Sequence, residues 1–266
     1  MVNQIVSLGL SDSDDTPGQT NRFYDHGFTI HQFIHLKSLS LYHLHSQQMM
    51  DQILSELSHL SSFARLTIKQ CSFPSDTTNA QSRINTIWSL PKLIHCSIEN
   101  DSEVRGRVVL PTVTSSSIRY FSIKSDRLYE HELAGLFERT LNLRHLSVNF
   151  SFSWPFGILS SSVTSIRTLD MSFFQVKSTT LVGFLEQLPN LCRLKLSTSY
   201  CYMYGEQWER MIKNHLPKLN TFQFRMKSAF GKEENCEQRI DEILNTFRNQ
   251  FWLDEHRWFV RCDWSP

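Results

Sequence analysis

The residues most able to do chemistry in this sequence fall into three groups, and the first is the cluster Glu130, His131 and Glu132. Two carboxylates beside an imidazole could transfer protons or hold a metal ion. The spacing does not support either reaction, because no H-E-x-x-H string is present. The surrounding segment, 128–137, carries apolar residues at helical spacing, so a solvated helix face is the favoured interpretation.

The six cysteines form the second group, and their spacing predicts neither a zinc site nor disulfides. Cys192 and Cys201 lie near each other in sequence, but no pair of histidines accompanies them at ligand spacing. No C-x-x-C pair occurs anywhere in the chain. Widely scattered thiols are typical of reduced cysteines in a reducing compartment.

A third cluster, Asp254, Glu255 and His256, lies between Trp252 and Trp258. It precedes a segment that alternates like a strand, so we interpret it as a turn with salt bridges. The chain has only nine glycines, and neither G-x-x-x-x-G-K-[ST] nor G-x-G-x-x-G occurs, so nucleotide binding has no support. We therefore expect no catalytic residue, no cofactor and no metal ion, and we do not expect an enzyme.

Charge and hydropathy say little about the partner. Lysine and arginine number 27 against 26 aspartates and glutamates, a net charge of +1, so no global field favours nucleic acid or an anionic membrane. No apolar run approaches the roughly 20 residues that span a bilayer, and no secretory signal opens the chain. We expect a cytoplasmic or nuclear protein that binds neither nucleic acid nor membrane.

An internal repeat in the sequence predicts the strands and helices that position these residues. The template L-x-x-L-x-L occurs nine times, with every leucine-like position apolar and most intervening positions polar. Such alternation predicts short strands with one buried and one wet face. The repeats are IVSLGL from Ile5, LKSLSL from Leu36, FARLTI from Phe63, LIHCSI from Leu93, IRYFSI from Ile118, LRHLSV from Leu143, IRTLDM from Ile166, LCRLKL from Leu191 and LNTFQF from Leu219.

Between these strands the apolar spacing changes to that of amphipathic helices. The predicted helices are 45–57, 79–90, 128–137, 178–188 and 206–216. One strand and one helix cannot bury their own apolar faces, so the units must stack. The expected fold is α/β, a horseshoe-shaped solenoid with a parallel sheet on the concave face and helices on the convex face.

Two connections and both ends depart from this pattern. After Ile98 and Val148 the chain favours crossings without a full helix. Four aromatic residues fill the second crossing or, alternatively, project as a ligand-binding loop: Phe150, Phe152, Trp154 and Phe156. We assign 1–226 to about nine irregular repeats and 227–266 to a cap of one helix, 236–250, and one strand, 258–264. The chain begins almost directly on a repeat strand, so we expect a fragment of a longer protein.

The repeats, with LPKL, LPNL and LPKL at 90, 188 and 216, resemble those of leucine-rich-repeat proteins. The tail FRNQFWLDEHRWFVRCDW, with DTPGQ and HGFTIHQFIHLKSLSLYHL near the start, resembles F-box and leucine-rich-repeat proteins. This resemblance implies repeats that bind the protein to be ubiquitinated and an F-box that binds the adaptor of a cullin ligase. Nothing in 1–31 matches an F-box, so adaptor binding would need an F-box outside this sequence. The alternative is a stand-alone interaction or scaffold protein.

One departure concerns the residue three places after each strand, where the leucine-rich-repeat consensus has Asn or Cys to bond the turn backbone. Only Cys71 fits, which predicts an irregular curve.

The third, fifth and seventh template positions should line the concavity and bind a protein. The face is mildly basic because only Glu99 and Asp170 are acidic, so an acidic or phosphorylated partner is expected. Tyr120, flanked by His95 and His145, is the expected anchor. Simple solvated strand positions are the alternative. The candidate residues are Arg65, Lys69, His95, Tyr120, Lys124, His145, Arg193, Lys195 and Arg225.

Overall fold

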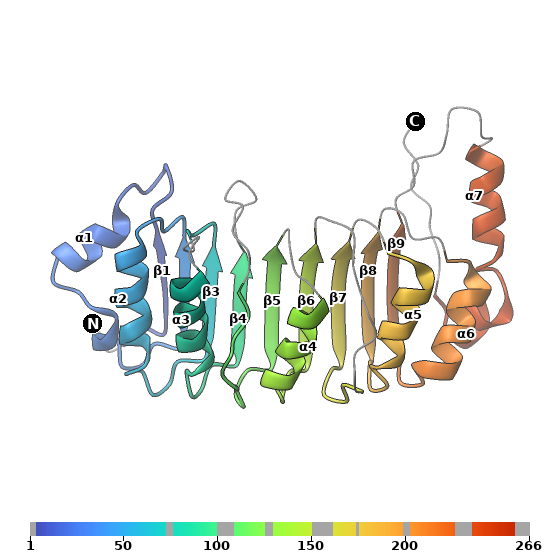
Figure 1. Ribbon diagram of the computed structural model, residues 1–266. Coiled ribbons are helices and arrows are strands. Elements are labelled where there is room, and N and C mark those ends of the chain that lie inside the picture. The colour runs from blue at the N-terminus through green and yellow to red at the C-terminus, as the bar shows by residue number, and fades with distance from the viewer. Residues whose placement is uncertain are drawn as a thin grey trace. The chain divides into compact units, whose positions relative to one another are not determined.

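A computed structural model describes residues 4–72, 77–99, 109–125, 130–150, 162–173, 176–198, 203–226 and 236–258. The chain divides into two compact units, Met1–Ser151 and Phe152–Pro266. Each unit contains parallel strands that alternate along the chain with helices (Figure 1). The assignment of 1–226 to repeats and 227–266 to a cap stays a prediction.

The first unit contains a parallel sheet whose strands follow one another in sequence order. Every strand begins at the third position of the predicted template, and third positions pair with third positions throughout this unit. The predicted positions of these strands are therefore confirmed. The strands are β1 (Ser7–Ser11), β2 (Ser38–Tyr42), β3 (Arg65–Lys69), β4 (His95–Glu99), β5 (Tyr120–Ser125) and β6 (His145–Phe150).

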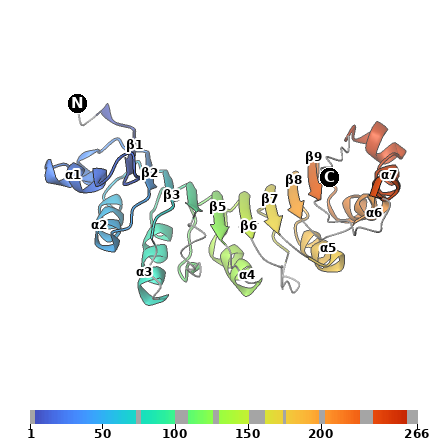
Figure 2. The ribbon, with the colours of Figure 1, turned by 90° about the horizontal axis from the view of Figure 1, so that it is seen from above.

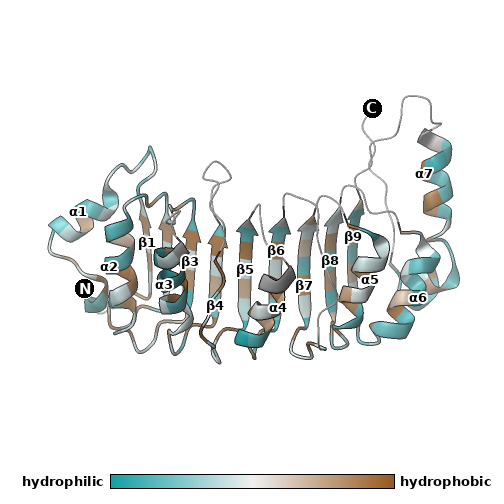
Figure 3. Ribbon diagram, viewed as in Figure 1, coloured by the Kyte–Doolittle hydropathy of each residue, from teal (hydrophilic) through white to brown (hydrophobic). Residues whose placement is uncertain are grey.

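Side-chain burial alternates along these strands as the sequence predicts. In β2, Leu39 and Leu41 are fully buried, whereas Ser38, Ser40 and Tyr42 are half-buried. The same alternation is visible as apolar and polar bands along the strands (Figure 3). Burial of one leucine-sized side chain contributes about 1.5–3 kcal/mol, so this buried face is the main stabilising element of the sheet.

The three longer helices of the first unit lie on one side of its sheet and do not cover the other side (Figure 2). They are α2 (Gln47–Leu57), α3 (Thr77–Trp88) and α4 (Glu130–Arg139), which confirm the predicted helices 45–57, 79–90 and 128–137. Ser46 caps α2, since its hydroxyl accepts the backbone N–H of Met49 at 3.3 Å.

Two short helices between β1 and β2 were not predicted, namely α1 (Gln19–Asp25) and η2 (Ile30–Gln32). Side chains tie α1 to the end of β1. The Gln19 side chain accepts the backbone N–H of Ser11 at 2.8 Å, and Asp12 accepts that of Thr20 at 2.8 Å. These contacts depend on the fold and leave no periodic signal in the sequence.

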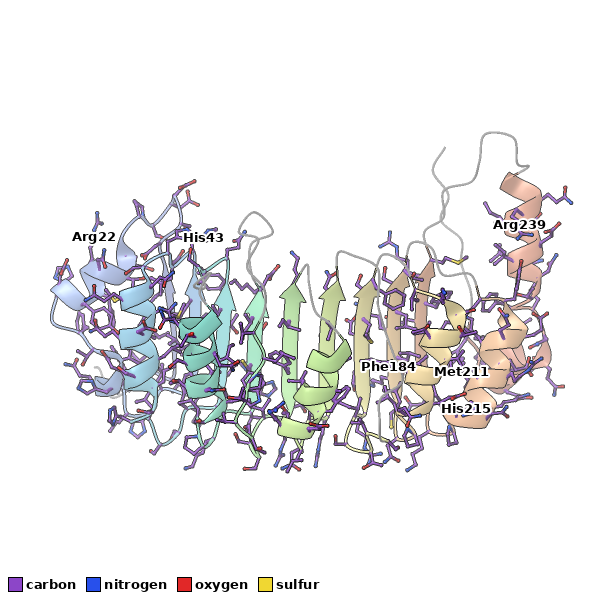
Figure 4. All side chains as sticks on the ribbon, in the orientation of Figure 1. Arg22, His43, Phe184, Met211, His215 and Arg239 are labelled. Atoms are coloured by element: carbon purple, nitrogen blue, oxygen red, sulfur yellow. The ribbon has the colours of Figure 1, made fainter. Side chains whose placement is uncertain are left out.

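The second unit contains three parallel strands, again in sequence order and in the predicted register. The helices α5 and α6 lie on one side of them (Figure 2). In Figure 4, Phe184 and Met211 mark these two helices, and both side chains are buried. The elements are β7 (Thr168–Phe173), α5 (Ser178–Glu186), β8 (Arg193–Thr198), α6 (Gly205–His215), β9 (Thr221–Met226), α7 (Cys236–Asn245) and the π-helical turn η3 (Phe251–Glu255).

An aromatic cluster follows the last strand of the second unit. Trp252 is fully buried, and its ring centroid lies 5.9 Å from that of Phe222 and 4.9 Å from that of Phe247. Phe222 also lies 4.9 Å from Trp208, a buried residue of α6. The predicted cap helix is α7, whereas the predicted cap strand lies outside the described residues except for Trp258.

Asp254 and Glu255 belong to η3, not to a simple turn. The salt bridges expected there are not found, because neither carboxylate forms an ion pair with any residue that the structure describes. His256 instead stacks on Trp258, with ring centroids 4.1 Å apart. Aromatic packing therefore replaces the expected ionic contacts.

Side chains near the strand ends hydrogen-bond to the backbone in two ways, one through Cys71 and one through asparagines. The Cys71 sulfur accepts the backbone N–H of Leu44 at 3.4 Å. Just before two strands, Asn142 donates to the Ser116 carbonyl at 2.7 Å and Asn190 donates to the Thr164 carbonyl at 2.8 Å. Side-chain amides thus join consecutive repeats at the amino-terminal ends of the strands.

Several expected features lie outside the described residues. The side chains of Glu130, His131 and Glu132 are not described, although their backbone is helical. The same holds for Cys201 and for the aromatic run 152–156. Within the two crossings predicted to lack a full helix, the described stretches 109–119 and 162–167 contain no helix.

Candidate binding surface on the open face of the sheet

The open face is the side of each sheet formed by the third, fifth and seventh template positions, opposite the helices. None of these side chains is buried in the described strands. In the first unit, strand register places Arg65, His95, Tyr120 and His145 next to one another in a single row. The sequence predicted all four as binding residues, and the fold brings them together.

Within this row, three rings are in contact. The rings of His95 and Tyr120 are stacked, with centroids 4.1 Å apart and planes 8° from parallel. The rings of Tyr120 and His145 lie 5.8 Å apart at 35°. Adjacent strands hold opposed side chains about 5 Å apart, which explains why third-position rings meet.

Tyr120 remains open to solvent despite this stacking, with 41% of its surface exposed. An exposed aromatic ring that its neighbours already hold in place loses little conformational entropy when a partner covers it. The row thus offers a preformed aromatic surface.

The environment of His95 disfavours its charged form. Burial is the main cause that lowers its pKa below the ordinary value, and the nearby charges of Arg65 and His145 lower it further. The uncharged form of the His95 imidazole is therefore favoured in the stack on Tyr120.

The seventh-position row differs, because its basic residues are paired with a carboxylate. Glu99 lies 3.6 Å from the Lys69 ammonium and 2.9 Å from that of Lys124. A hydrogen bond from Lys124 is the leading cause that lowers the pKa of Glu99. Glu99 therefore compensates part of the positive charge that the sequence predicted here.

The second unit places three further candidates on its own open face. Lys195 forms an ion pair with Asp170 at 2.9 Å, so its charge is also compensated. Arg193 and Arg225 are exposed, and neither forms an ion pair within the described part of the chain. The second unit lacks the aromatic row of the first, since Thr168, Arg193 and Thr221 occupy its third positions.

Sequence analysis missed which basic residues would be neutralised. It named Lys69, Lys124 and Lys195 as basic residues of this face without assigning them partners, although each has an acidic residue at the paired position of a neighbouring strand. Once the template register is known, these cross-strand pairs follow from the sequence. The stacking of His95 on Tyr120 requires the side-chain positions themselves.

The described residues show no arrangement typical of metal or thiol chemistry. No group of three or more His, Cys, Asp or Glu side chains among them could hold a metal ion. Burial raises the pKa of the Cys71 thiol to about 11 and that of Cys96 to about 12, so both stay protonated. No helix in the described part of the chain is long and apolar enough to cross a membrane.

Comparison with known proteins yields a structural alignment and no family match. No protein-family model matches the sequence, and no curated protein matches it. A solved structure described as "Crystal structure of TLR13-ssRNA13 complex" aligns with 87% of this chain, at 12% sequence identity and a TM-score of 0.38. The alignment covers 37% of that chain, so this protein spans little more than a third of its length.

The fold class therefore rests on the protein's own topology. Parallel strands in sequence order, each beginning at the same position of a leucine-rich template and alternating with helices, make this chain an α/β protein of the leucine-rich-repeat solenoid type.

Proposed function

We propose that the open face of the first unit binds a protein partner and that Tyr120 is its central anchor. The observation that carries the proposal is the row His95, Tyr120 and His145, in which the His95 ring stacks on one side of a tyrosine that is 41% exposed and the tilted His145 ring flanks the other. Tyrosine is enriched among residues that dominate binding energy, because its ring buries a large area and its hydroxyl can form a hydrogen bond.

The small neighbours of this row support the same function. The fifth positions of β3 to β6 are hydroxyl residues, and all are half-buried: Thr67, Ser97, Ser122 and Ser147. Because these fifth-position side chains are small, the larger side chains at the third and seventh positions project beyond them on the open face. Hydroxyl groups between exposed rings and charged groups suit a polar peptide backbone better than a lipid or a small apolar ligand.

The partner is an acidic or phosphorylated protein segment. Arg65 adjoins the aromatic row and forms no ion pair within the described residues, so its guanidinium is available for a carboxylate or a phosphate. Of the remaining predicted residues, Lys69 and Lys124 keep one net positive charge with Glu99, while Arg193, Lys195 and Arg225 form a separate basic group in the second unit.

The biological setting that we favour is substrate recognition within an F-box-type ubiquitin ligase of the cytoplasm or nucleus. The support is the resemblance of the tail, 247–264, and of the repeats to F-box and leucine-rich-repeat proteins. A stand-alone interaction or scaffold protein would use the same surface. Affinity purification of the full-length product, scored for the ligase adaptor and cullin subunits, distinguishes the two settings.

The anchor is tested by comparing wild type with Tyr120→Ala for binding to a partner that such a purification identifies. Loss of an anchor ring costs about 2 kcal/mol or more, a reduction in affinity of roughly 30-fold. Tyr42→Ala is the matched control, since Tyr42 lies on the same face at a seventh position of β2. Equal affinity of wild type and Tyr120→Ala would contradict the proposed surface.

A further inference from the structure

Two arginines lie side by side at the amino-terminal edge of the first unit's sheet. Arg119 directly precedes β5 and Arg144 directly precedes β6. Their backbones are in contact, because the Arg144 N–H donates to the Arg119 carbonyl at 2.8 Å. Both side chains are exposed, and neither forms an ion pair with a residue that the structure describes.

This edge lacks the compensation found at the opposite edge. The second and third template positions of the first unit contain no acidic residue; their cationic members are Lys37, Arg65, Arg119 and Arg144. At the carboxyl-terminal edge, by contrast, Glu99 bridges Lys69 and Lys124. Like charges on adjacent strands repel, so the arginine pair destabilises the folded chain locally. Among the described residues, no acidic side chain pairs with either arginine to offset this repulsion.

The arginine pair also borders the aromatic row. Arg119 is the residue before Tyr120, and Arg144 is the residue before His145. An anionic group held by the two guanidiniums would therefore lie at the edge of the sheet next to the strand positions of Tyr120 and His145, where one partner segment can contact both the arginines and the tyrosine. A partner with acidic residues next to an apolar or aromatic residue fits both features at once.

A purely structural role for the pair is the competing explanation. Cations near the carboxyl-terminal end of a helix are stabilising, and Arg144 follows the end of α4, Glu130–Arg139, by a few residues. This explanation predicts that removal of the charge lowers the melting temperature. Relief of repulsion between the two arginines predicts an unchanged or slightly higher melting temperature.

We propose that Arg119 and Arg144 form an anion-binding site for neighbouring carboxylates on an acidic polypeptide segment, whose adjacent apolar side chain covers Tyr120. This inference rests on the proposed function, which it deepens by assigning the acidic part of the partner to the amino-terminal edge. The paired lysines at the opposite edge contribute little to the same contact. Arg119 and Arg144 are thus binding residues beyond the third, fifth and seventh positions.

The experiment measures binding of a fluorescein-labelled peptide, with four glutamates followed by one phenylalanine, to the full chain by fluorescence anisotropy at low salt. The double variant Arg119→Gln and Arg144→Gln removes two charges from the amino-terminal edge. The matched control, Lys69→Gln and Lys124→Gln, removes two charges from the carboxyl-terminal edge. Tyr120→Ala reports on the anchor, and thermal melting reports on the fold of each variant.

We expect the arginine variant to weaken binding about tenfold, since each exposed charge-assisted contact accounts for about a threefold change, and to melt no lower than wild type. The lysine variant should weaken binding less than about threefold. Equal losses in the two double variants would overturn the inference, because they would indicate attraction by net charge alone. A lower melting temperature of the arginine variant with unchanged peptide binding would assign the pair a structural role instead.

Two further outcomes separate this inference from the proposed function. If Tyr120→Ala abolishes peptide binding and the arginine variant does not weaken it, the proposed binding surface is supported and the proposed anion-binding site is contradicted. If the wild-type chain does not bind the peptide at about 1 mM, both the proposed binding surface and the anion-binding site are contradicted for acidic polypeptide partners. Tighter binding of a single-stranded RNA of equal charge, lost in the arginine variant, would overturn the assignment to an acidic polypeptide.

Discussion

The first unit has a row of aromatic rings on the open face of its strands, whereas the aromatic cluster around Trp252 in the second unit lies on the core side of the strands. In the first unit, His95, Tyr120 and His145 form a row on the open face, where Tyr120 is exposed. In the second unit, Phe222 occupies a core position and packs against the buried Trp252. The same template thus places rings where they can meet a partner in one unit and where they cover the end of the core in the other.

The difference follows from the alternation of strand side chains. A shift of one residue moves a side chain from the open face to the core. A ring at a third position lies outside the core and leaves apolar surface in water. A ring at a fourth or sixth position lies in the core and must be enclosed by other apolar groups. Substitutions in the cluster around Trp252 should therefore lower stability, whereas substitutions in the row of His95, Tyr120 and His145 should weaken binding.

Removal of the Trp252 ring should have the largest effect on stability. The side chain is fully buried between Phe222 and Phe247, so Trp252→Ala should lower the free energy of unfolding by about 3–5 kcal/mol. Urea unfolding followed by circular dichroism measures the loss. Leu253→Ala is the matched control, because Leu253 is 40% exposed, and it should cost less than about 1 kcal/mol. Equal losses would refute the enclosed cluster.

Glycine substitution compares close packing in the second unit with open space in the first. A β-carbon at Gly205 would overlap the carbonyl oxygen of Thr246, so Gly205→Ala should cost about 1–3 kcal/mol through displacement of that backbone. At Gly9 no atom lies within 4 Å of the added carbon, and Gly9→Ala should change the unfolding free energy by less than about 0.5 kcal/mol. The prediction fails if the two variants unfold at the same urea concentration.

The pH dependence of stability should report on the aromatic row. The pKa of His95 is lowered in the folded state, first by burial and then by Arg65 and His145, so the unfolded chain binds the proton more readily. Stability is therefore lost as pH falls from about 6.5, the ordinary pKa of histidine, through the lower folded value. His95→Phe keeps a ring on Tyr120 and should show a shallower loss between about pH 7 and pH 5. Parallel curves for variant and wild type would contradict this account.

The ion pairs of the open faces should have the smallest effect. A double-mutant cycle on Asp170 and Lys195, which lie 2.9 Å apart with partly exposed side chains, should give a coupling of about 0.2–1 kcal/mol that declines with added salt. The pair Glu99 and Lys124 should behave alike in the first unit. A coupling above about 2 kcal/mol for either pair would mean that these contacts stabilise the sheet and do not merely neutralise its surface.

Much of the fold could be predicted because its signals are local. The apolar positions of each template repeat alternate within six residues, which is enough to locate β1 through β9 and their register. Helical spacing located α2 to α7 for the same reason. α1 was missed because it is held by the side chains of Gln19 and Asp12 and not by an apolar periodicity.

The candidate site could be predicted only in part. Template position named Arg65, His95, Tyr120 and His145, since residues at equal positions of neighbouring repeats must become neighbours in space. Template position did not reveal that the rings stack or that Tyr120 stays open. Those features depend on side-chain rotamers and on the burial that surrounding residues impose.

Sequence by itself therefore determined which residues face the core and which face outward, because strand alternation and helical periodicity are properties of short segments. Tertiary structure decided which of the outward charges are paired. Lys69 and Lys124 share Glu99, while Arg119 and Arg144 share no acidic neighbour among the described residues. The physical reason is that charge compensation depends on distances between side chains of different repeats, and those distances exist only once the strands are side by side.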